Sequence, residues 1–330
     1  MHDRTAESGV EAEGAGSRAL AIFARVLNAS LLRLHAGGPL CSGELEEKLG
    51  WAPKASLRLA TANLCDLGAL GQIESSGASQ GNVTELTHTG HGLLAVADEL
   101  ERWLSRSPFG PISLPDTAAR GTVRALTAGW DSTIVTALAA RPLTLAELDA
   151  KIPCHSYSKL KRRLAKLRSA NLVAPLGSNG KGASYVASDW LRRAIAPLSV
   201  AGRWERSHVA TKTEPLSRRE VEAAFLLSLP LVELPRAACG SGVLAALVSA
   251  GAVDQAQPKL AAVSFVVKDG RIVSCSPGAP TAPTTWALGT QDAWLDALID
   301  ARLDVLRVRG VNQALALDVV GGLHDALFAA

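Results

Sequence analysis

The sequence contains few aromatic residues, which make up only 4% of its 330 positions, so its hydrophobic cores must be built mainly from Leu, Ala and Val. It also lacks a long hydrophobic run. The longest apolar stretch, from Gly242 to Val253, is interrupted by Ser249 and Gly251 and is too short to cross a bilayer. The five cysteines are widely spaced without a Cys-x-x-Cys pair, and no signal peptide is recognisable, so we expect a reducing, cytoplasmic environment.

The motifs of common enzyme and metal sites are missing as well. Cys239-Gly240-Ser241-Gly242 has neither the Lys-Ser/Thr of a phosphate-binding loop nor the spacing of a Gly-x-Ser-x-Gly nucleophile. The pair His88 and His91, like the pair Cys154 and His155, brings no second pair at ligand spacing. We therefore expect no enzyme activity, no catalytic residues, no cofactor and no metal.

Positive charge is concentrated in the middle of the chain. Residues 116–210 carry 15 Lys and Arg against 6 Asp and Glu, whereas residues 18–107 carry 8 against 9 and residues 211–330 carry 10 against 12. A chain of this length exceeds the size of a single core, so two or three domains are expected. The charge asymmetry predicts that the middle domain meets a polyanionic partner.

An internal repeat organises the first two thirds. Pro39-Leu40-x-x-x-Glu44-Leu45 recurs 103 residues later as Pro142-Leu143-x-x-x-Glu147-Leu148. The same offset, without a gap, also matches Lys48 with Lys151, Leu57 with Leu160, Ala62 with Ala165 and Leu64 with Leu167. Two related units of about a hundred residues are therefore expected.

The second unit shows its expected elements most clearly. We predict a helix over residues 121–140, a short helix in which Thr144 and Glu147 form a capping box, and a third helix capped by Ser156. Helical spacing predicts that this third helix buries one face, made of Tyr157, Leu160, Leu164 and Leu167. Short strands at 172–174 and 184–186 flank a Gly-rich loop, and a last helix is expected over 189–204.

This order of elements resembles the winged helix-turn-helix of HxlR-type bacterial transcription regulators. The resemblance covers residues 121–206 and is fainter over residues 22–106, where Gly68 follows the third helix and Trp103 closes the unit. It depends on the following residues of the second unit: Trp130, Pro142-Leu143-x-x-x-Glu147-Leu148, Arg163-Leu164-x-x-Leu167-x-x-Ala170-Asn171-Leu172, Tyr185 and Trp204. It implies that the third helix lies in the DNA major groove.

The outward face of that helix supplies the predicted DNA contacts. Arg162, at its centre, is the candidate for a bidentate contact to guanine, whereas Lys159 and Lys166 suit phosphates. Wing residues reach the neighbouring backbone in this interpretation. The complete predicted set is Ser156, Tyr157, Ser158, Lys159, Lys161, Arg162, Arg163, Lys166, Asn179 and Lys181.

The first unit is expected to have lost this ability. At the same offset it has Ser56 for Lys159, Leu59 for Arg162 and Asn63 for Lys166. A Leu at the centre of the face fits burial against protein better than contact with DNA. Because regulators of this type usually act as homodimers, the degenerate unit is expected to substitute for a second subunit, which makes a pseudo-dimer; further oligomerisation stays open.

The last third is expected to mix helices and strands. We predict a helix opened by a capping box of Ser217 and Glu220, and a hairpin of residues 260–267 and 271–276 around Asp269-Gly270. Further elements are a strand at 284–288, a helix at 291–299, a strand at 305–309 and a helix at 312–328. Together they indicate an α+β domain.

The order of these elements looks like the sterol-carrier-protein fold. The matching residues are Gly289-Thr290, Trp294-Leu295-x-Ala297-Leu298, Leu306-x-Val308-x-Gly310 and Leu315-Ala316, although Val311 stands where an acidic residue is common. The resemblance implies an apolar cavity for a hydrophobic small molecule. Its predicted walls, which are equally compatible with an ordinary core, are Phe225, Phe265, Trp286 and Trp294.

The sequence thus predicts a mainly α protein with small β wings, namely two winged helix-turn-helix units, followed by an α+β domain. The expected parts are a disordered tail (1–16), a degenerate first unit (17–107), a DNA-contacting second unit (116–210) and a ligand-sensing domain (215–330). The function indicated is a ligand-responsive transcription regulator that binds double-stranded DNA, with Trp204 to Pro215 as the moving joint and no membrane partner. The alternatives are a winged-helix protein-interaction scaffold, and a small-molecule enzyme that dimerises through its winged helix.

Overall fold

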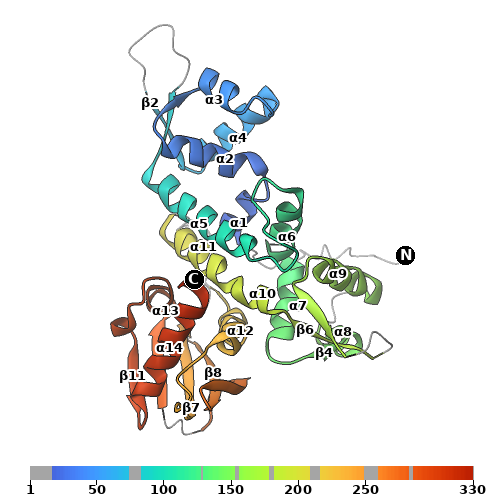
Figure 1. Ribbon diagram of the computed structural model, residues 1–330, viewed down its shortest axis with the longest axis vertical. Helices are drawn as coiled ribbons and strands as arrows, with labels where there is room; N and C mark the ends of the chain where they lie inside the picture. The colour runs from blue at the N-terminus through green and yellow to red at the C-terminus, as the bar shows by residue number, and fades with distance from the viewer. Residues whose placement is uncertain are drawn as a thin grey trace, which may run out of the picture.

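The computed structural model describes residues 17–73, 83–127, 129–152, 156–177, 182–208, 216–248, 259–281 and 285–329, without the side chains of residues 129–132. These residues form a mixed α/β structure with three separate sheets. Figure 1 shows the first unit at the top, the second at the right, the C-terminal domain at the lower left, and two long helices at the centre. Among the described helices, none is both long and apolar enough to cross a membrane.

The first unit consists of helices around a small antiparallel sheet of order β1-β3-β2. Its elements are α1 (Arg18–Ile22), α2 (Val26–Ala36), β1 (Leu40–Cys41), α3 (Ser42–Lys48), α4 (Lys54–Asp66), β2 (Leu70–Ile73), β3 (Val83–Leu86) and α5 (His88–Ser105). The apolar positions of α4, namely Leu57, Ala60 and Leu64, are buried, which fixes the helix against its neighbours.

The second unit repeats this order, with a sheet β4-β6-β5. Its elements are α6 (Thr117–Thr127), α7 (Gly129–Ala139), β4 (Leu143–Thr144), α8 (Leu145–Lys151), α9 (Tyr157–Ser169), β5 (Val173–Leu176), β6 (Ser184–Ala187), α10 (Asp189–Arg193) and α11 (Ile195–His208).

The helix expected over 121–140 is described as Thr117–Thr127 and Gly129–Ala139, on either side of a residue outside the described ranges, and it begins earlier than expected. One other helix of the second unit differs from the sequence prediction. The helix expected over 189–204 is divided at Ala194. Pro197 has no N–H for the carbonyl of Arg193 and its ring crowds that carbonyl, so it is accommodated only in the first turn of a new helix.

Residues 103 positions apart occupy equivalent places in the two units. The short helices α3 and α8 begin with capping boxes made by Cys41 with Glu44 and by Thr144 with Glu147. After α4 and α9 the chain turns through positive φ, at Gly68 (69°) and Asn171 (53°). From β3 and β6 onward the offset is 101, and the N-cap hydroxyls of Thr87 and Ser188 both donate to the carbonyls of those turn residues.

Helices α5 and α11 bring the units together as an antiparallel pair with pseudo-twofold symmetry. Trp103 Nε1 donates to the Trp190 carbonyl at 2.8 Å, and the equivalent Trp204 Nε1 donates to the Thr89 carbonyl at 2.9 Å. The Trp103 and Trp190 rings stack with centroids 4.6 Å apart. Gly92 permits the close approach, since a Cβ there would lie 2.9 Å from Trp204 Cδ1.

The C-terminal domain is a five-stranded sheet, of order β11-β10-β7-β8-β9, with helices packed on one face. Among the described strands of this sheet, β7 and β10 form the one parallel pair. The elements are α12 (Arg218–Ser228), β7 (Gly240–Val248), β8 (Lys259–Lys268), β9 (Arg271–Pro277), β10 (Thr285–Thr290), α13 (Gln291–Ile299), β11 (Arg307–Gly310) and α14 (Gln313–Phe328), with short 3-10 turns at Leu229–Leu231 and Leu303–Val305.

Most elements predicted in this domain are present. Asp269 and Gly270 take positive φ values of 50° and 77° between β8 and β9, as a tight hairpin turn requires. The strand expected at 305–309 covers Arg307–Gly310, and its first residues form a 3-10 turn instead. The central strand β7 was not predicted at all.

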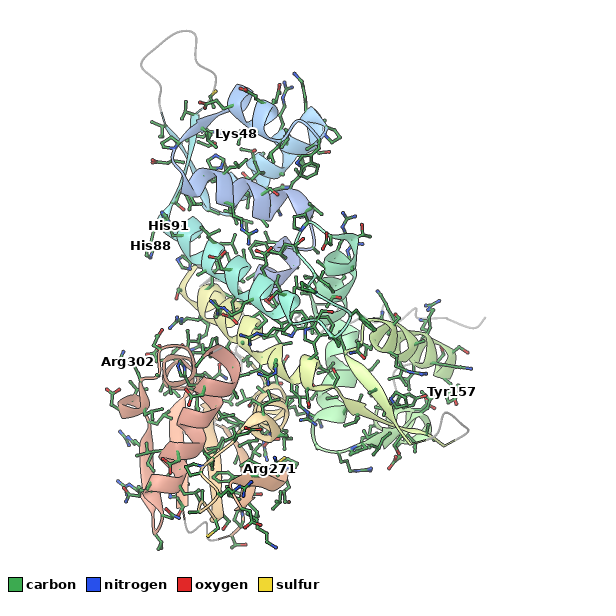
Figure 2. All side chains as sticks on the ribbon, viewed as in Figure 1. Lys48, His88, His91, Tyr157, Arg271 and Arg302 are labelled. Atoms are coloured by element: carbon green, nitrogen blue, oxygen red, sulfur yellow. The ribbon has the colours of Figure 1, made fainter. Side chains whose placement is uncertain are left out.

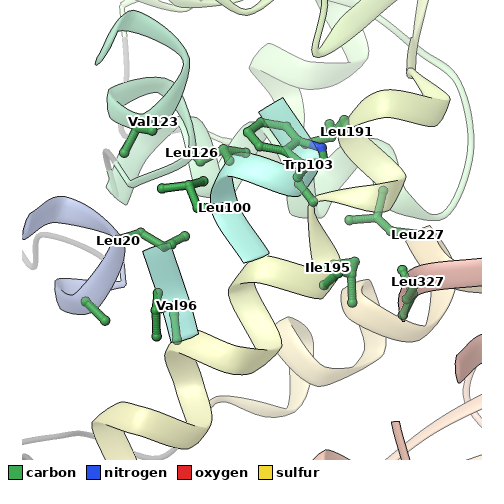
Figure 3. Packing of buried hydrophobic residues seen from close by; sticks show 14 of the residues in the cluster. Leu20, Val96, Leu100, Trp103, Val123, Leu126, Leu191, Ile195, Leu227 and Leu327 are labelled. Carbon is green, nitrogen blue, oxygen red and sulfur yellow. The ribbon is translucent and has the colours of Figure 1, made fainter. Parts of the chain in front are cut away.

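The C-terminal domain is attached to the second unit through arginines of α10 and α11. Arg206 makes two contacts to the carboxylate of Asp292, at 2.6 and 2.7 Å, and Arg203 pairs with Asp300. Arg192 donates to the carbonyls of Leu226 and Leu227 at the end of α12. Figure 3 shows the apolar core at this junction, where side chains of α5, α6, α10, α11, α12 and α14 meet.

Candidate nucleic-acid interface

Helix α9 is held firmly in the second unit. The Ser156 hydroxyl caps it by accepting from Lys159 N, and Leu160, Leu164 and Leu167 are at most 2% exposed. The prediction that Tyr157 belongs to this buried face is wrong: its side chain is 52% exposed, because it occupies the first helical position, beyond the packed stripe. Figure 2 shows it at the outer end of the unit.

The opposite face of α9 is exposed and cationic. Ser158, Lys159, Lys161, Arg162 and Lys166 are all exposed. Within the described ranges, no acidic side chain lies within salt-bridge distance of these four cations. Arg163 is half-buried and has an interaction of its own. The face therefore has uncompensated positive charge directed to solvent.

Neighbouring elements fix the orientation of this face. The guanidinium of Arg168, at the end of α9, lies 5.7 Å from the ring centroid of Tyr185 in β6, which links helix and hairpin by a cation–π contact. Helix α8 is fixed by its capping box, in which Glu147 accepts from Thr144 N at 2.8 Å and from Arg141 at 2.8 Å. The hydrogen bond from the Thr144 backbone, and then that from Arg141, lower the pKa of Glu147 to about 2. The predicted wing contacts Asn179 and Lys181 lie outside the described residues.

The net charge of the second unit overstates the positive charge that is available to bind DNA around α9. Arg192, Arg193, Arg203 and Arg206 all bind groups of the C-terminal domain, and Arg193 donates to the Ala326 carbonyl at 2.8 Å. These four cations hold the molecule together. Among the described cations of the unit, those on the outward face of α9 are therefore the ones that this helix can offer to a partner.

The equivalent helix of the first unit has a different surface. Its two cations, Lys54 and Arg58, both lie near the Glu46 carboxylate of α3, at 2.6 and 3.8 Å. Leu59, at the position of Arg162, was expected to be buried against protein but is 61% exposed, as is Trp51. The face of α4 is thus nearly neutral and apolar.

The aromatic residues predicted to line a ligand cavity are mostly part of the core. Phe225, Phe265 and Trp294 are at most 4% exposed; the Phe225 and Trp294 rings meet edge to face at 4.7 Å, and Trp294 Nε1 donates to the Ala245 carbonyl. Trp286 lies apart from them, against Val243 and Ala245 on the sheet's second apolar cluster. None of the four lines the hollow between α9 and β5 or the hollow between the first unit and α6. The cavity in this domain stays a prediction.

No metal centre is evident either: the described residues contain no group of three or more His, Cys, Asp and Glu side chains able to hold an ion. Comparison of the sequence with protein-family models gives no match, and neither does comparison with curated proteins.

Proposed function

We propose that this protein is a DNA-binding transcription regulator with two winged helix-turn-helix units, of which the second inserts α9 into the major groove. The observation that carries the proposal is the exposed cationic face of α9, which no acidic side chain of the described residues pairs with, above a buried leucine stripe. A helix placed in this way can bring Arg162 to base edges while Lys159 and Lys166 meet phosphates.

The pseudo-twofold pairing of α5 with α11 supports the same proposal. It joins the two units as terminal helices join the subunits of a dimer, so one chain is sufficient for the arrangement. The C-terminal domain is, in this proposal, a sterol-carrier-like regulatory domain that acts on the second unit. The salt bridges of Arg203 and Arg206 give it a direct mechanical connection to α11.

Binding to duplex DNA across a salt series tests the proposal, with genomic fragments first selected for a preferred site. Arg162→Ala is expected to cost about 1–3 kcal/mol and to relax specificity, because it removes a base contact. Lys166→Ala is expected to lower the salt slope by about 1 with little change in specificity. Arg307→Ala, an exposed arginine of β11, is the matched control and should change neither quantity.

The proposal fails if Arg162→Ala and Lys166→Ala behave like the Arg307→Ala control. It fails equally if no selected duplex binds better than random DNA. In either case the units would be protein-interaction modules.

A further inference from the structure

A hollow of about 380 Å³ lies where the first unit meets α6 of the second. Its walls come from the turn between α1 and α2, from the chain around the start of α4, and from α6. Figure 1 shows α6 beside α1, below the helices of the first unit. Because these three segments are far apart in the sequence, no motif marks the hollow.

One wall of the hollow contains a buried acceptor without a partner. Asn28 is 4% exposed, and its Nδ2 donates to the Ile22 carbonyl at 2.9 Å. Its Oδ1 accepts nothing, and among the described residues it is the one buried side-chain polar atom in that condition. Such an unmet group costs about 1–3 kcal/mol, and because Oδ1 is itself shielded from solvent, it marks a poorly satisfied wall rather than a contact point for a ligand.

The other walls combine apolar surface with positive charge. Trp51 and Leu59 both line the hollow and are both 61% exposed. Arg25, Arg120 and Arg124 line it too, and within the described ranges no acidic side chain pairs with them. Large exposed apolar side chains beside uncompensated arginines fit a ligand that is itself apolar and negatively charged.

We propose that this hollow binds a small planar aromatic anion. The ring system lies against Trp51 and Leu59, and the anionic group pairs with Arg120 and Arg124. This site is distinct from the cavity predicted in the C-terminal domain, and it does not depend on DNA binding.

The position of the hollow explains the degenerate surface of the first unit. Ser56 and Leu59, which line it, stand 103 residues before Lys159 and Arg162 of α9. At these equivalent positions the second unit has cations exposed to solvent, whereas the first unit has side chains that line the binding site. Since α6 belongs to the second unit, a bound anion connects both units.

The test is a fluorescence titration of the full chain, without DNA, with 8-anilinonaphthalene-1-sulfonate, which has aromatic rings and a sulfonate. We expect one saturable site. The double variant Arg120→Gln with Arg124→Gln should weaken binding at least about tenfold, because charge-assisted contacts are lost. Trp51→Ala should also weaken it. Arg307→Gln, which removes an exposed charge elsewhere, should leave it unchanged, and each variant must keep the wild-type circular dichroism spectrum.

Uncharged N-phenyl-1-naphthylamine is the comparison ligand, and its binding should not respond to the arginine changes. The proposal is overturned if the sulfonate binds the arginine double variant and the Arg307→Gln control equally well. It is also overturned if the neutral compound binds as tightly as the sulfonate. Should Trp51→Ala fail to fold, the arginine pair alone decides. Loss of this site would leave the DNA-binding proposal intact, because that proposal rests on the separate response of Arg162→Ala.

Discussion

Two glycines on the paired central helices allow a quantitative test of how the units join. Gly92 lies within α5 and Gly202 within α11. In either helix, replacing Gly by Ala favours the helical conformation by about 0.5–1 kcal/mol. The two sites differ only in what the new methyl group meets. At Gly202 nothing lies within 4 Å, whereas at Gly92 the Cβ would lie 2.9 Å from Trp204 Cδ1 and 3.4 Å from Trp204 Nε1.

Trp204 has little freedom to move away from that methyl group. Its side chain is 4% exposed and its Nε1 is hydrogen-bonded to the Thr89 carbonyl. Overpacking of a fixed core neighbour costs about 1–3 kcal/mol, which exceeds the gain in helix propensity. We therefore expect Gly92→Ala to lower the free energy of unfolding by about 0.5–2 kcal/mol, and Gly202→Ala to raise it by about 0.5–1 kcal/mol.

The assay is urea denaturation of both variants and the wild type, followed by circular dichroism and compared through midpoint and slope. A third variant, Gly121→Ala on α6, serves as a second open site, since nothing lies within 4 Å there either. If Gly92→Ala stabilises the protein as much as the two open-site variants do, Trp204 is not packed on α5, and the pseudo-twofold pairing described above is wrong.

Two other predictions concern the first unit and the attachment of the C-terminal domain. His35 is buried; its Nδ1 donates to the Leu31 carbonyl and its Nε2 accepts from Thr84. Burial lowers the pKa of His35. The folded protein therefore binds a proton at this side chain less readily than the unfolded chain, in which histidine has a pKa near 6.5. Stability is then complete above that pH and decreases as the pH falls through it. His35→Leu, which places in the first unit the residue that Leu138 supplies in the second, should flatten the fall below about pH 7, and an unchanged pH profile would contradict the assignment. Arg206→Glu should lower the free energy of unfolding by about 1 kcal/mol, and adding Asp292→Arg should restore most of it, as measured in a double-mutant cycle; absence of restoration would mean that the pair contributes nothing.

The sequence indicates local structure where short-range chemistry decides it. Capping residues such as Ser156, Thr144 and Ser217 mark helix starts within a residue or two, and Asp269-Gly270 marks a hairpin. Strand β7 escapes detection because it is buried on both faces between β8 and β10. Its apolar residues therefore do not alternate with polar ones, and periodicity cannot distinguish such a run from a buried helix.

The candidate site was predictable only in part, for a similar reason. The outward cations of α9 follow from helical spacing within one segment. The partners of other arginines do not follow from helical spacing. Arg206 pairs with Asp292, and Arg192 donates to carbonyls of α12, so these partners depend on how distant segments pack. The hollow around Asn28 combines three segments in the same way, so local patterns could not reveal it.

Because both units belong to one chain, equivalent positions of the two units can differ in some places and stay alike in others. Two identical chains in a symmetric dimer must present the same helix surface twice. Here α4 and α9 are covalently joined, so Leu59 and Arg162 can serve different purposes at equivalent positions. The α5–α11 pair has less freedom, because it is buried from both sides. Its two equivalent indole hydrogen bonds, from Trp103 and Trp204 to backbone carbonyls, are present in both halves although the neighbouring side chains differ. The exposed helix faces have diverged further, into a cationic surface in one unit and the lining of a hollow in the other.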